Sequence, residues 1–254
     1  MIDKTAIIDK AANIDSSVCI GPNTIIGADV AIKANVIIGP NCVIDHCQID
    51  EGCKISCGVV LGGDPQDLSY KDEPSKVYIG SQTVLREFVT INRGTAKTLK
   101  TVIGKNCFFM AYTHAAHDDV VGDNVILANY AALGGHVEVG SNVFLGGHVG
   151  VHQFCKIGRG VMAAAGTIVT MDIVPFAMCG GYRAVIEGLN IVGMRRLKMA
   201  AADIAQIKHI YKILFSQGLL LKDAVGEIEK LDSPFAKEIL EFIKRSGRAL
   251  ARPK

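Results

Sequence analysis

An aliphatic or small apolar residue returns at every sixth position along most of the chain. The first series is Ile8, Ile14, Ile20, Ile26, Ile32, Ile38 and Ile44. After one missing residue the series resumes at Ile49, and a second long series runs from Ile103 to Val169. This period predicts a parallel β-helix, in which each hexad forms one short strand and one turn and three hexads close a triangular coil. The aliphatic residues point inward and stack on the next coil about 4.8 Å away.

Two polar segments interrupt this period. They span residues 62–78 and 92–101, and the first contains two prolines. Insertions in a solenoid leave the coil as loops, commonly on the binding face, so we expect both segments to serve the function. The period ends near Pro175, and apolar residues then recur near the helical spacing of 3.6. We therefore expect a mainly β domain over residues 1–189 and a small α-helical domain of three or four helices over residues 190–254.

The composition excludes a disordered chain. It favours a fold built from small repeated turns over one with a core of large aromatic rings. The chain is 49% hydrophobic and 20% charged, with 27 glycines and only 6% aromatic residues. It contains no apolar run long enough to span a membrane, and its first residues lack the hydrophobic stretch of a signal peptide. The eight cysteines include no CxxC motif, which favours a cytoplasmic protein with reduced thiols as core residues. Those assigned to small-residue slots of the repeat are Cys19, Cys42, Cys53, Cys107 and Cys155.

The net charge of +2 is unevenly distributed. Residues 191–254 carry 13 Lys or Arg against 7 Asp or Glu, whereas residues 1–190 carry 14 against 18. A basic C-terminal part attracts acidic macromolecules. Solvated helix faces produce the same imbalance, so charge alone leaves both interpretations open.

The six-residue period also places several histidines relative to one another. His117 and His136 are 19 residues apart, so they are neighbours on adjacent coils, while His148 falls on a different corner. His152 follows His136 by 16 residues, again close to one coil. Because a polar ring is costly to bury in an aliphatic prism, we expect these side chains to face a cleft. One coil supplies a single wall, so we expect the second wall to come from another subunit.

Several motifs resemble those of bacterial UDP-N-acetylglucosamine O-acyltransferases, and the resemblance runs essentially end to end. The motifs are Gln66-Asp67-Leu68, Glu73-Pro74, Arg93-Gly94-Thr95, His114-Ala115-Ala116-His117-Asp118, Ile126-Leu127-Ala128-Asn129, Gly135-His136-Val137 and Val151-His152-Gln153-Phe154-Cys155. The resemblance implies a left-handed parallel β-helix of hexapeptide repeats and a homotrimer with sites between protomers. It also implies transfer of a 3-hydroxyacyl group from acyl carrier protein to the 3-hydroxyl of UDP-N-acetylglucosamine, the first step of lipid A biosynthesis, without a cofactor.

The same resemblance implies a role for each matching residue. His117 is the general base, Asp118 orients it, and the Gly135 N–H stabilises the oxyanion; these roles suit the chemistry of a weak hydroxyl nucleophile. The expected substrate-binding residues are Gln66 and Asp67 in the first segment, His114 and His136 at the sugar, His152 and Gln153 further along the cleft, and Asn190 and Arg196 at the nucleotide. The basic helices would meet the acidic carrier protein.

The chain departs from the family pattern at a few positions. Ser69 stands where the family often has Lys, which points to a variant sugar such as a 3-amino analogue. Val192 and Leu197 replace an acidic residue and an arginine near the nucleotide. Ala165 stands where the family sets acyl length with Gly, and its extra methyl group favours a shorter chain.

Three other interpretations fit parts of the sequence. A trimeric β-helix carbonic anhydrase also carries several histidines on one edge, where three hold Zn²⁺, but the inserted segments and the basic helical part argue against it. A scaffold or lipid-carrier binder leaves the histidines unexplained. An acetyltransferase that uses coenzyme A fits the basic C-terminal part less well than one that uses a carrier protein.

Overall fold

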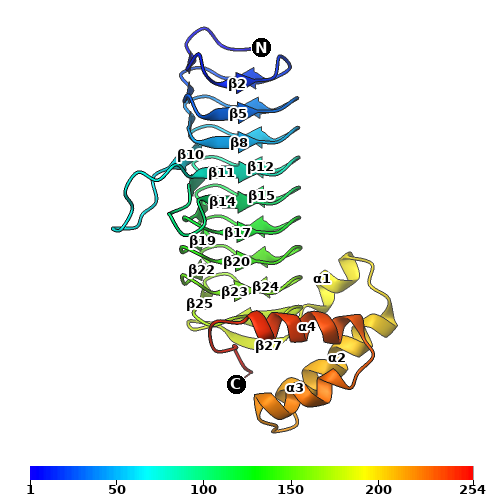
Figure 1. Cartoon of the computed structure of the whole chain (residues 1–254). Coiled ribbons are helices and arrows are strands. Elements are labelled where there is room, and N and C mark those ends of the chain that lie inside the picture. The colour runs from blue at the N-terminus through cyan, green and yellow to red at the C-terminus, as the bar shows by residue number, and fades with distance from the viewer. Residues whose placement is uncertain (254) are drawn as a thin grey trace.

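The computed structural model describes residues 1–253 as a stack of short strands closed at its C-terminal end by helices (Figure 1). Three sheets run along the stack, with nine, eight and ten strands. Within each sheet the paired strands are parallel, except for the last pair, β26 and β27. The predicted parallel β-helix with C-terminal helices is therefore confirmed.

Most strands contain two residues, as expected for a hexapeptide repeat. The first sheet contains β1 (Ile7–Ile8), β4 (Ile25–Ile26), β7 (Val43–Ile44), β10 (Val60–Gly63), β13 (Thr90–Asn92), β16 (His114–Ala115), β19 (Ala132–Leu133), β22 (Gly150–Val151) and β25 (Ile168–Val169). The second sheet contains β2 (Asn13–Ile14), β5 (Val30–Ile32), β8 (Cys47–Ile49), β11 (Lys76–Ile79), β14 (Lys100–Ile103), β17 (Val120–Val121), β20 (Glu138–Val139) and β23 (Lys156–Ile157). The third sheet contains β3 (Cys19–Ile20), β6 (Ile37–Ile38), β9 (Lys54–Ile55), β12 (Val84–Leu85), β15 (Phe108–Phe109), β18 (Ile126–Leu127), β21 (Phe144–Leu145), β24 (Met162–Ala163), β26 (Ala177–Gly180) and β27 (Val185–Leu189).

The core of the stack is the series of inward-pointing aliphatic residues. The second residue of a two-residue strand is the inward one, and Ile26 pairs with Ile44 in the next coil, both fully buried. Corners turn through residues with positive φ, among them Asn106, Asn124 and Asn142. Asparagine tolerates this left-handed conformation because its short polar side chain can hydrogen-bond locally. Four of the five cysteines expected in the core are buried, but Cys19 is only half-buried because it is the outward residue of its strand.

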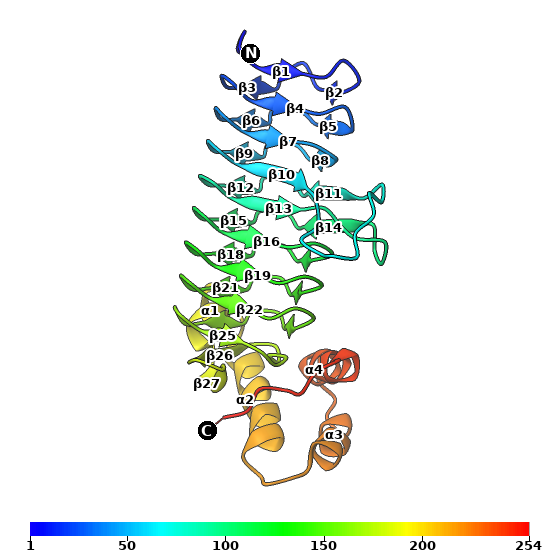
Figure 2. The same cartoon turned by 90° about the vertical axis from the view of Figure 1, so that its left-hand side faces the viewer.

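Both interruptions of the period leave the stack at the same corner, between the first and second sheets (Figure 2). The first loop joins β10 to β11 through residues 64–75, and the second loop joins β13 to β14 through residues 93–99. Both are shorter than the segments expected from the sequence, because the ends of each segment pair in longer strands such as β11 and β14. The two loops come from adjacent coils, so they lie above the same edge of the prism.

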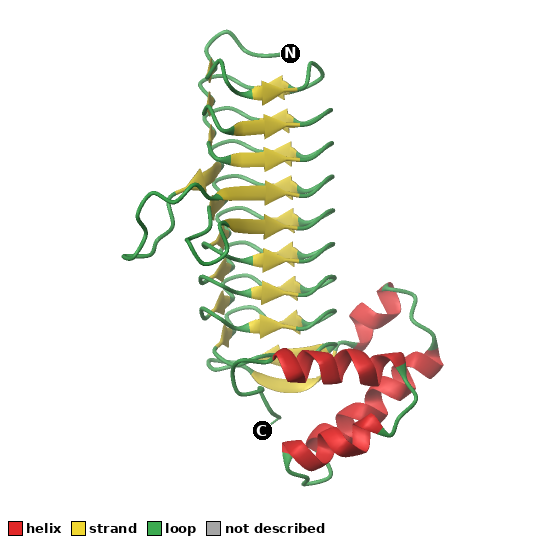
Figure 3. Ribbon diagram, viewed as in Figure 1, coloured by secondary structure: helices red, strands yellow, loops and turns green. Residues whose placement is uncertain are grey.

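The C-terminal helices cover the last coils (Figure 3). They are α1 (Ile191–Arg196), α2 (Ala201–Phe215), α3 (Leu221–Glu229) and α4 (Pro234–Arg245). The Tyr211 hydroxyl of α2 donates to the carbonyl of Pro175 at 2.6 Å, and Arg159 of the stack pairs with Glu238 of α4. The chain then returns to the stack, where Leu250 bridges to Asp172. None of the helices within residues 1–253 is both long and apolar enough to cross a membrane.

Candidate active site

The site is built on the corner from which both loops leave. Below the loops this corner is formed by residues 117–118, 135–136 and 153–154 on three successive coils, and we call it the histidine corner. Its second positions, Asp118, His136 and Phe154, all have positive φ, between 61° and 65°. Side chains at these positions follow one another at the spacing of the coils. The rings of His136 and Phe154 are stacked, with centroids 4.6 Å apart.

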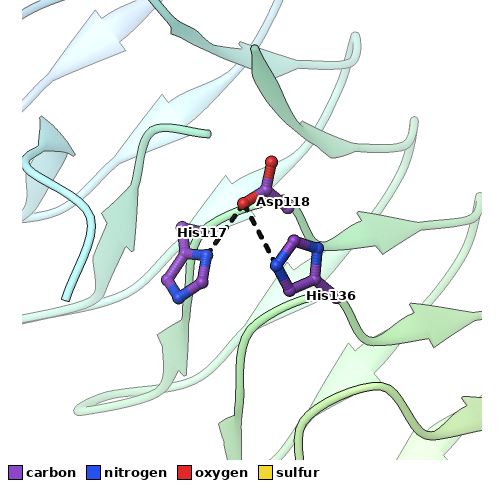
Figure 4. A group of neighbouring side chains, drawn as sticks. All are labelled: His117, Asp118 and His136. Carbon is purple, nitrogen blue, oxygen red and sulfur yellow. Dashed lines mark hydrogen bonds and ion pairs between the residues drawn. The ribbon is translucent and has the colours of Figure 1, made fainter. Parts of the chain in front are cut away.

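His117 and Asp118 form a buried pair at the top of this corner (Figure 4). The Nδ1 atom of His117 lies 2.8 Å from Asp118 Oδ2, and the Asp118 side chain is fully buried. The ring of His136 meets the His117 ring edge to face, with centroids 5.2 Å apart. The predicted proximity of the two histidines is therefore confirmed. If Nδ1 donates to Asp118, the lone pair of His117 Nε2 is left free to accept a proton.

Three threonines from the second loop and the start of β14 surround Asp118. The Thr95 N–H and hydroxyl both donate to the carboxylate, at 3.1 Å and 2.8 Å, and the Thr98 hydroxyl donates to Oδ1. The Thr101 hydroxyl accepts from the Asp118 N–H at 2.9 Å. Burial alone would raise the pKa of Asp118, but the donors Thr98, His117 and Thr95 together lower it below the usual range. Asp118 is therefore held as a carboxylate.

The hexapeptide period and the motifs predicted no functional role for these threonines. Thr95, Thr98 and Thr101 recur at three-residue spacing inside the second interruption. That spacing is a signal, because hydroxyl groups in an inserted segment can satisfy a buried carboxylate. Their target depends on which corner lies beneath the loop, and this only the fold shows.

Gly135 packs directly against the His117 ring. A Cβ atom at Gly135 would lie 2.5 Å from His117 Cε1 and 2.6 Å from Nε2, so any side chain here would displace the ring. The Gly135 carbonyl accepts from the Phe154 N–H, whereas the Gly135 N–H has no acceptor among residues 1–253. A free N–H beside the reactive edge of an imidazole is suited to a developing oxyanion.

The remaining histidines of the predicted sugar pocket lie close by. His114 projects outward from β16, and its Nδ1 lies 2.8 Å from the Thr90 hydroxyl of the strand above. Burial lowers the pKa of His114 and that of His136; the positive charge of Lys97 adds to the effect on His136, and Asp118 opposes it. Both rings are thus biased toward the neutral form, which can accept as well as donate hydrogen bonds.

The first loop places Asp67 within electrostatic range of His117 and Lys97. The N–H and hydroxyl of Ser69 both donate to the Asp67 carboxylate at 2.8 Å, and these bonds are the main cause of its lowered pKa, with smaller contributions from His117 and Lys97. Ser69, the departure noted in the sequence, thus organises the tip of the loop. Gln66 is exposed beside it. Arg93 anchors the base of the loop through Asp64, at 2.6 Å.

Four of the other predicted residues lie away from the His117–Asp118 pair. His152 and Gln153 are exposed at the lower end of the histidine corner, where His152 Nδ1 lies 3.2 Å from a guanidinium nitrogen of Arg248. Asn190 caps α1 by accepting from the Gly193 N–H, and it donates to the carbonyl of Gly160 at the corner between the second and third sheets. Arg196 is exposed in the last turn of α1.

Ala165 is also exposed, in the turn between β24 of the third sheet and β25 of the first. Gly146, one coil earlier, packs closely against Ala165. A Cβ atom at Gly146 would lie 2.6 Å from the Ala165 nitrogen. Ala165 therefore belongs to neither the histidine corner nor the corner of Asn190. Within a single chain, therefore, the predicted site residues do not all lie at one place on the surface.

The same cluster offers donors for a metal ion. One ligand atom each from His117, Asp118 and His136 lie within 4.8 Å of one another. Two imidazoles and a carboxylate are ligands that Zn²⁺ accepts. However, Asp118 Oδ2 already takes hydrogen bonds from Thr95 and from His117 Nδ1. A metal at Oδ2 would compete with the bond that fixes the tautomer of His117.

Sequence and structure comparisons find close relatives. Residues 172–251 match the family model described as UDP N-acetylglucosamine O-acyltransferase, domain 2. The chain is 40% identical to the acyl-[acyl-carrier-protein]–UDP-N-acetylglucosamine O-acyltransferase of Campylobacter concisus over 206 residues, which cover 80% of this chain and 78% of the relative. It is 42% identical to the enzyme of the same name from Nautilia profundicola over 193 residues, 75% of this chain and 74% of the relative. The solved structure of UDP-N-acetylglucosamine acyltransferase from Campylobacter jejuni superposes with a TM-score of 0.95 at 37% identity, covering 100% of both chains.

Proposed function

We propose that this chain, which belongs to the family of acyl-[acyl-carrier-protein]–UDP-N-acetylglucosamine O-acyltransferases, transfers a (3R)-3-hydroxyacyl group from acyl carrier protein to the 3-hydroxyl of UDP-N-acetylglucosamine, with His117 as the general base. It is an acyltransferase, and this reaction is the first step of lipid A biosynthesis. The observation that supports the assignment most directly is the His117–Asp118 pair, with Nδ1 held at 2.8 Å from the carboxylate and Gly135 against the other edge of the ring.

The chemistry follows from this arrangement. His117 Nε2 takes the proton of the sugar hydroxyl as the oxygen attacks the thioester carbonyl, and Asp118 stabilises the imidazolium that forms. The carbonyl oxygen becomes an oxyanion, to which the free Gly135 N–H donates. When the intermediate collapses, the ester forms, the C–S bond breaks, and the proton on His117 passes to the leaving thiolate. Every step uses side chains and backbone groups of the chain itself.

The substrate contacts are proposals of the same kind. His114 and His136 would line the sugar pocket, and Gln66 and Asp67 of the first loop would meet the sugar from above. His152 and Gln153 would extend the cleft, while Asn190 and Arg196 would hold the nucleotide, with Arg196 suited to a phosphate. The basic part, residues 191–254, would receive the acidic carrier protein.

A homotrimer would bring these residues together. Asn190 bonds to Gly160 at the corner between the second and third sheets, whereas His117 lies at the corner between the first and second. One protomer therefore presents them on different edges. The third sheet carries half-buried apolar residues on its outer face, a surface that a second copy can cover. Those in the lower coils are Val84, Phe108, Ile126, Phe144 and Met162.

An acyl-transfer assay with UDP-N-acetylglucosamine and 3-hydroxyacyl carrier protein tests the proposal. We expect His117→Ala to lower kcat by about 10²–10⁴-fold, the contribution typical of a general base. Circular dichroism of the variant checks that the β-helix is intact. Retained activity in a folded variant would contradict the role of His117.

The same assay across acyl lengths tests Ala165, for which we expect shorter chains to be preferred.

The assay also separates two alternatives. If the folded wild type transfers nothing to UDP-N-acetylglucosamine, the 3-amino analogue is the next acceptor to test, because Ser69 replaces the usual lysine of the first loop. A zinc enzyme remains the second candidate, because His117, Asp118 and His136 are close enough to share an ion. Activity that disappears on chelation and returns with Zn²⁺ would favour that candidate over the acyltransferase.

A further inference from the structure

Lys97 extends from the second loop along the histidine corner. Its Nζ atom lies 5.2 Å from the centroid of the Phe154 ring. Phe154 is two coils below Asp118, about 10 Å at the strand spacing of a β-sheet. The loop itself is tied to Asp118 through Thr95 and Thr98, so the Lys97 side chain spans the corner from the level of Asp118 to that of Phe154. His136 lies between these two levels, stacked on Phe154.

The Lys97 ammonium is not paired within the chain. Among residues 1–253, no carboxylate lies within 4.0 Å of it, whereas Lys33, Lys76 and Lys156 all have such partners. Its contact with Phe154 is to a ring face at an exposed site, where cation–π attraction is weak. The three N–H donors of the ammonium thus remain available to an anion.

The Lys97 charge also acts on two neighbouring titratable groups. Lys97 is among the groups that lower the pKa of His136, after burial, and it contributes to the lowered pKa of Asp67, after the hydrogen bonds from Ser69. Lys97 therefore influences residues on both sides of the predicted sugar pocket. The other cation of this loop, Arg93, is buried and bound to Asp64 and Tyr70, so it cannot take this role.

We propose that Lys97 is a substrate-binding residue whose ammonium binds a phosphate of the sugar nucleotide. The inference rests on the proposed function, because His117 then fixes the position of the acceptor hydroxyl. That hydroxyl and the diphosphate are attached to the same pyranose ring, so the diphosphate lies within a short distance of His117. The phosphate of the acyl donor is separated from the thioester by the whole pantetheine arm. A single flexible cation beside the sugar pocket thus fits the diphosphate better.

Kinetics of Lys97→Met, with Lys100→Met as the matched control, test this inference. Lys100 is also exposed, three residues further along the chain, at the start of β14. We expect Lys97→Met to raise KM for UDP-N-acetylglucosamine by about tenfold or more, the loss that one charge-assisted hydrogen bond to phosphate predicts. KM for the acyl carrier protein should not change. Lys97→Arg should retain most of the binding, and Lys100→Met should behave as wild type.

Calorimetric titration of UDP-N-acetylglucosamine into the enzyme without acyl donor gives a second measurement that does not need turnover. We expect weaker binding to Lys97→Met, with a difference from wild type that shrinks as salt rises. A rise in KM for the acyl carrier protein alone would assign Lys97 to the donor and overturn the inference. Unchanged KM values and unchanged affinity would also overturn it while the wild type still transfers acyl groups. A wild type that binds the nucleotide through Lys97 but transfers nothing would instead refute the proposed function.

Discussion

At the scale of single residues, two adjacent carboxyl groups occupy opposite environments. Asp118 accepts bonds from His117, Thr95 and Thr98, and its pKa is lowered. Asp119 is also fully buried, but only its Oδ1 accepts a hydrogen bond, from the Val137 N–H at 2.8 Å, and Oδ2 has no partner among residues 1–253. Burial therefore raises the pKa of Asp119 well above its usual value, with a smaller effect from Asp118. The two neighbouring carboxyl groups are therefore biased in opposite directions, Asp118 toward the charged form and Asp119 toward the neutral form.

The raised pKa of Asp119 predicts a pH dependence of stability. The folded state keeps this proton while the unfolded chain releases it above a pKa of about 3.9, so the stability that Asp119 contributes falls as pH rises from there. The amide of Asp119→Asn can still accept from Val137 and cannot ionise. We expect this variant to melt above wild type at pH 7, by about 2–4 °C for each kcal/mol gained, and the difference to vanish toward pH 4. Melting curves at several pH values measure it, with the exposed Asp232→Asn as control. A difference that does not vary with pH would contradict the assignment.

At the scale of elements, the threonines of the second loop contact Asp118 and are proposed to act through it rather than through substrate. Two of its hydroxyl groups, those of Thr95 and Thr98, are aimed at the carboxylate, and Thr101 at the start of β14 holds the Asp118 N–H. A carboxylate fixed from several directions keeps the His117 ring in one orientation. The insertion therefore supplies Asp118 with hydrogen-bond donors that a short hexapeptide turn cannot provide.

Replacement of Thr98 tests this positioning role. Thr98→Val keeps the shape of the side chain but removes the donor to Asp118, and we expect kcat to fall by about 10-fold, corresponding to roughly 1.4 kcal/mol for a hydrogen bond to a charged group. KM for both substrates should stay near wild type, because Thr98 touches neither in the proposed mechanism. Thr98→Ser restores the hydroxyl and should restore kcat. A rise in KM without a change in kcat would show instead that Thr98 acts on the substrate.

At the scale of the whole molecule, the proposed site needs more than one copy of the chain. The exposed Arg196 and the cap Asn190 are on α1, and the His117–Asp118 pair is on a different edge of the prism. In a closed cyclic assembly, the same contact repeats between every pair of neighbours. Each site then combines His117 of one protomer with Arg196 of the next.

Co-expression of two inactive variants tests this arrangement. His117→Ala and Arg196→Ala alone should each be impaired, but mixed trimers contain sites in which both residues are intact. Random assembly of equal amounts gives about a quarter of the wild-type activity, because each intact site needs one chain of each kind in a fixed order. Sedimentation of the wild type establishes the number of copies. No recovery of activity in verified mixed oligomers would place the two residues in the same protomer or in no common site.

The six-residue period by itself determined the architecture. Strict recurrence of aliphatic residues fixes which side chains point inward, so the coils, the corners and the proximity of His117 to His136 followed from spacing alone. This works because a solenoid makes sequence distance nearly equivalent to spatial distance. The sequence also located both interruptions and the motif that carries the His117–Asp118 pair.

Only the tertiary structure decided what the interruptions do. The six-residue period predicts where a loop leaves the stack. It does not predict where the side chains of the loop lie, because the loop residues are outside the repeat. Three contacts are therefore visible only in the folded chain. They are the hydrogen bonds of the threonines to Asp118, the hydrogen bonds of Ser69 to Asp67, and the contact of Lys97 with the Phe154 ring. The different environments of Asp118 and Asp119 were equally hidden, since adjacent residues at a corner point in different directions and meet different donors.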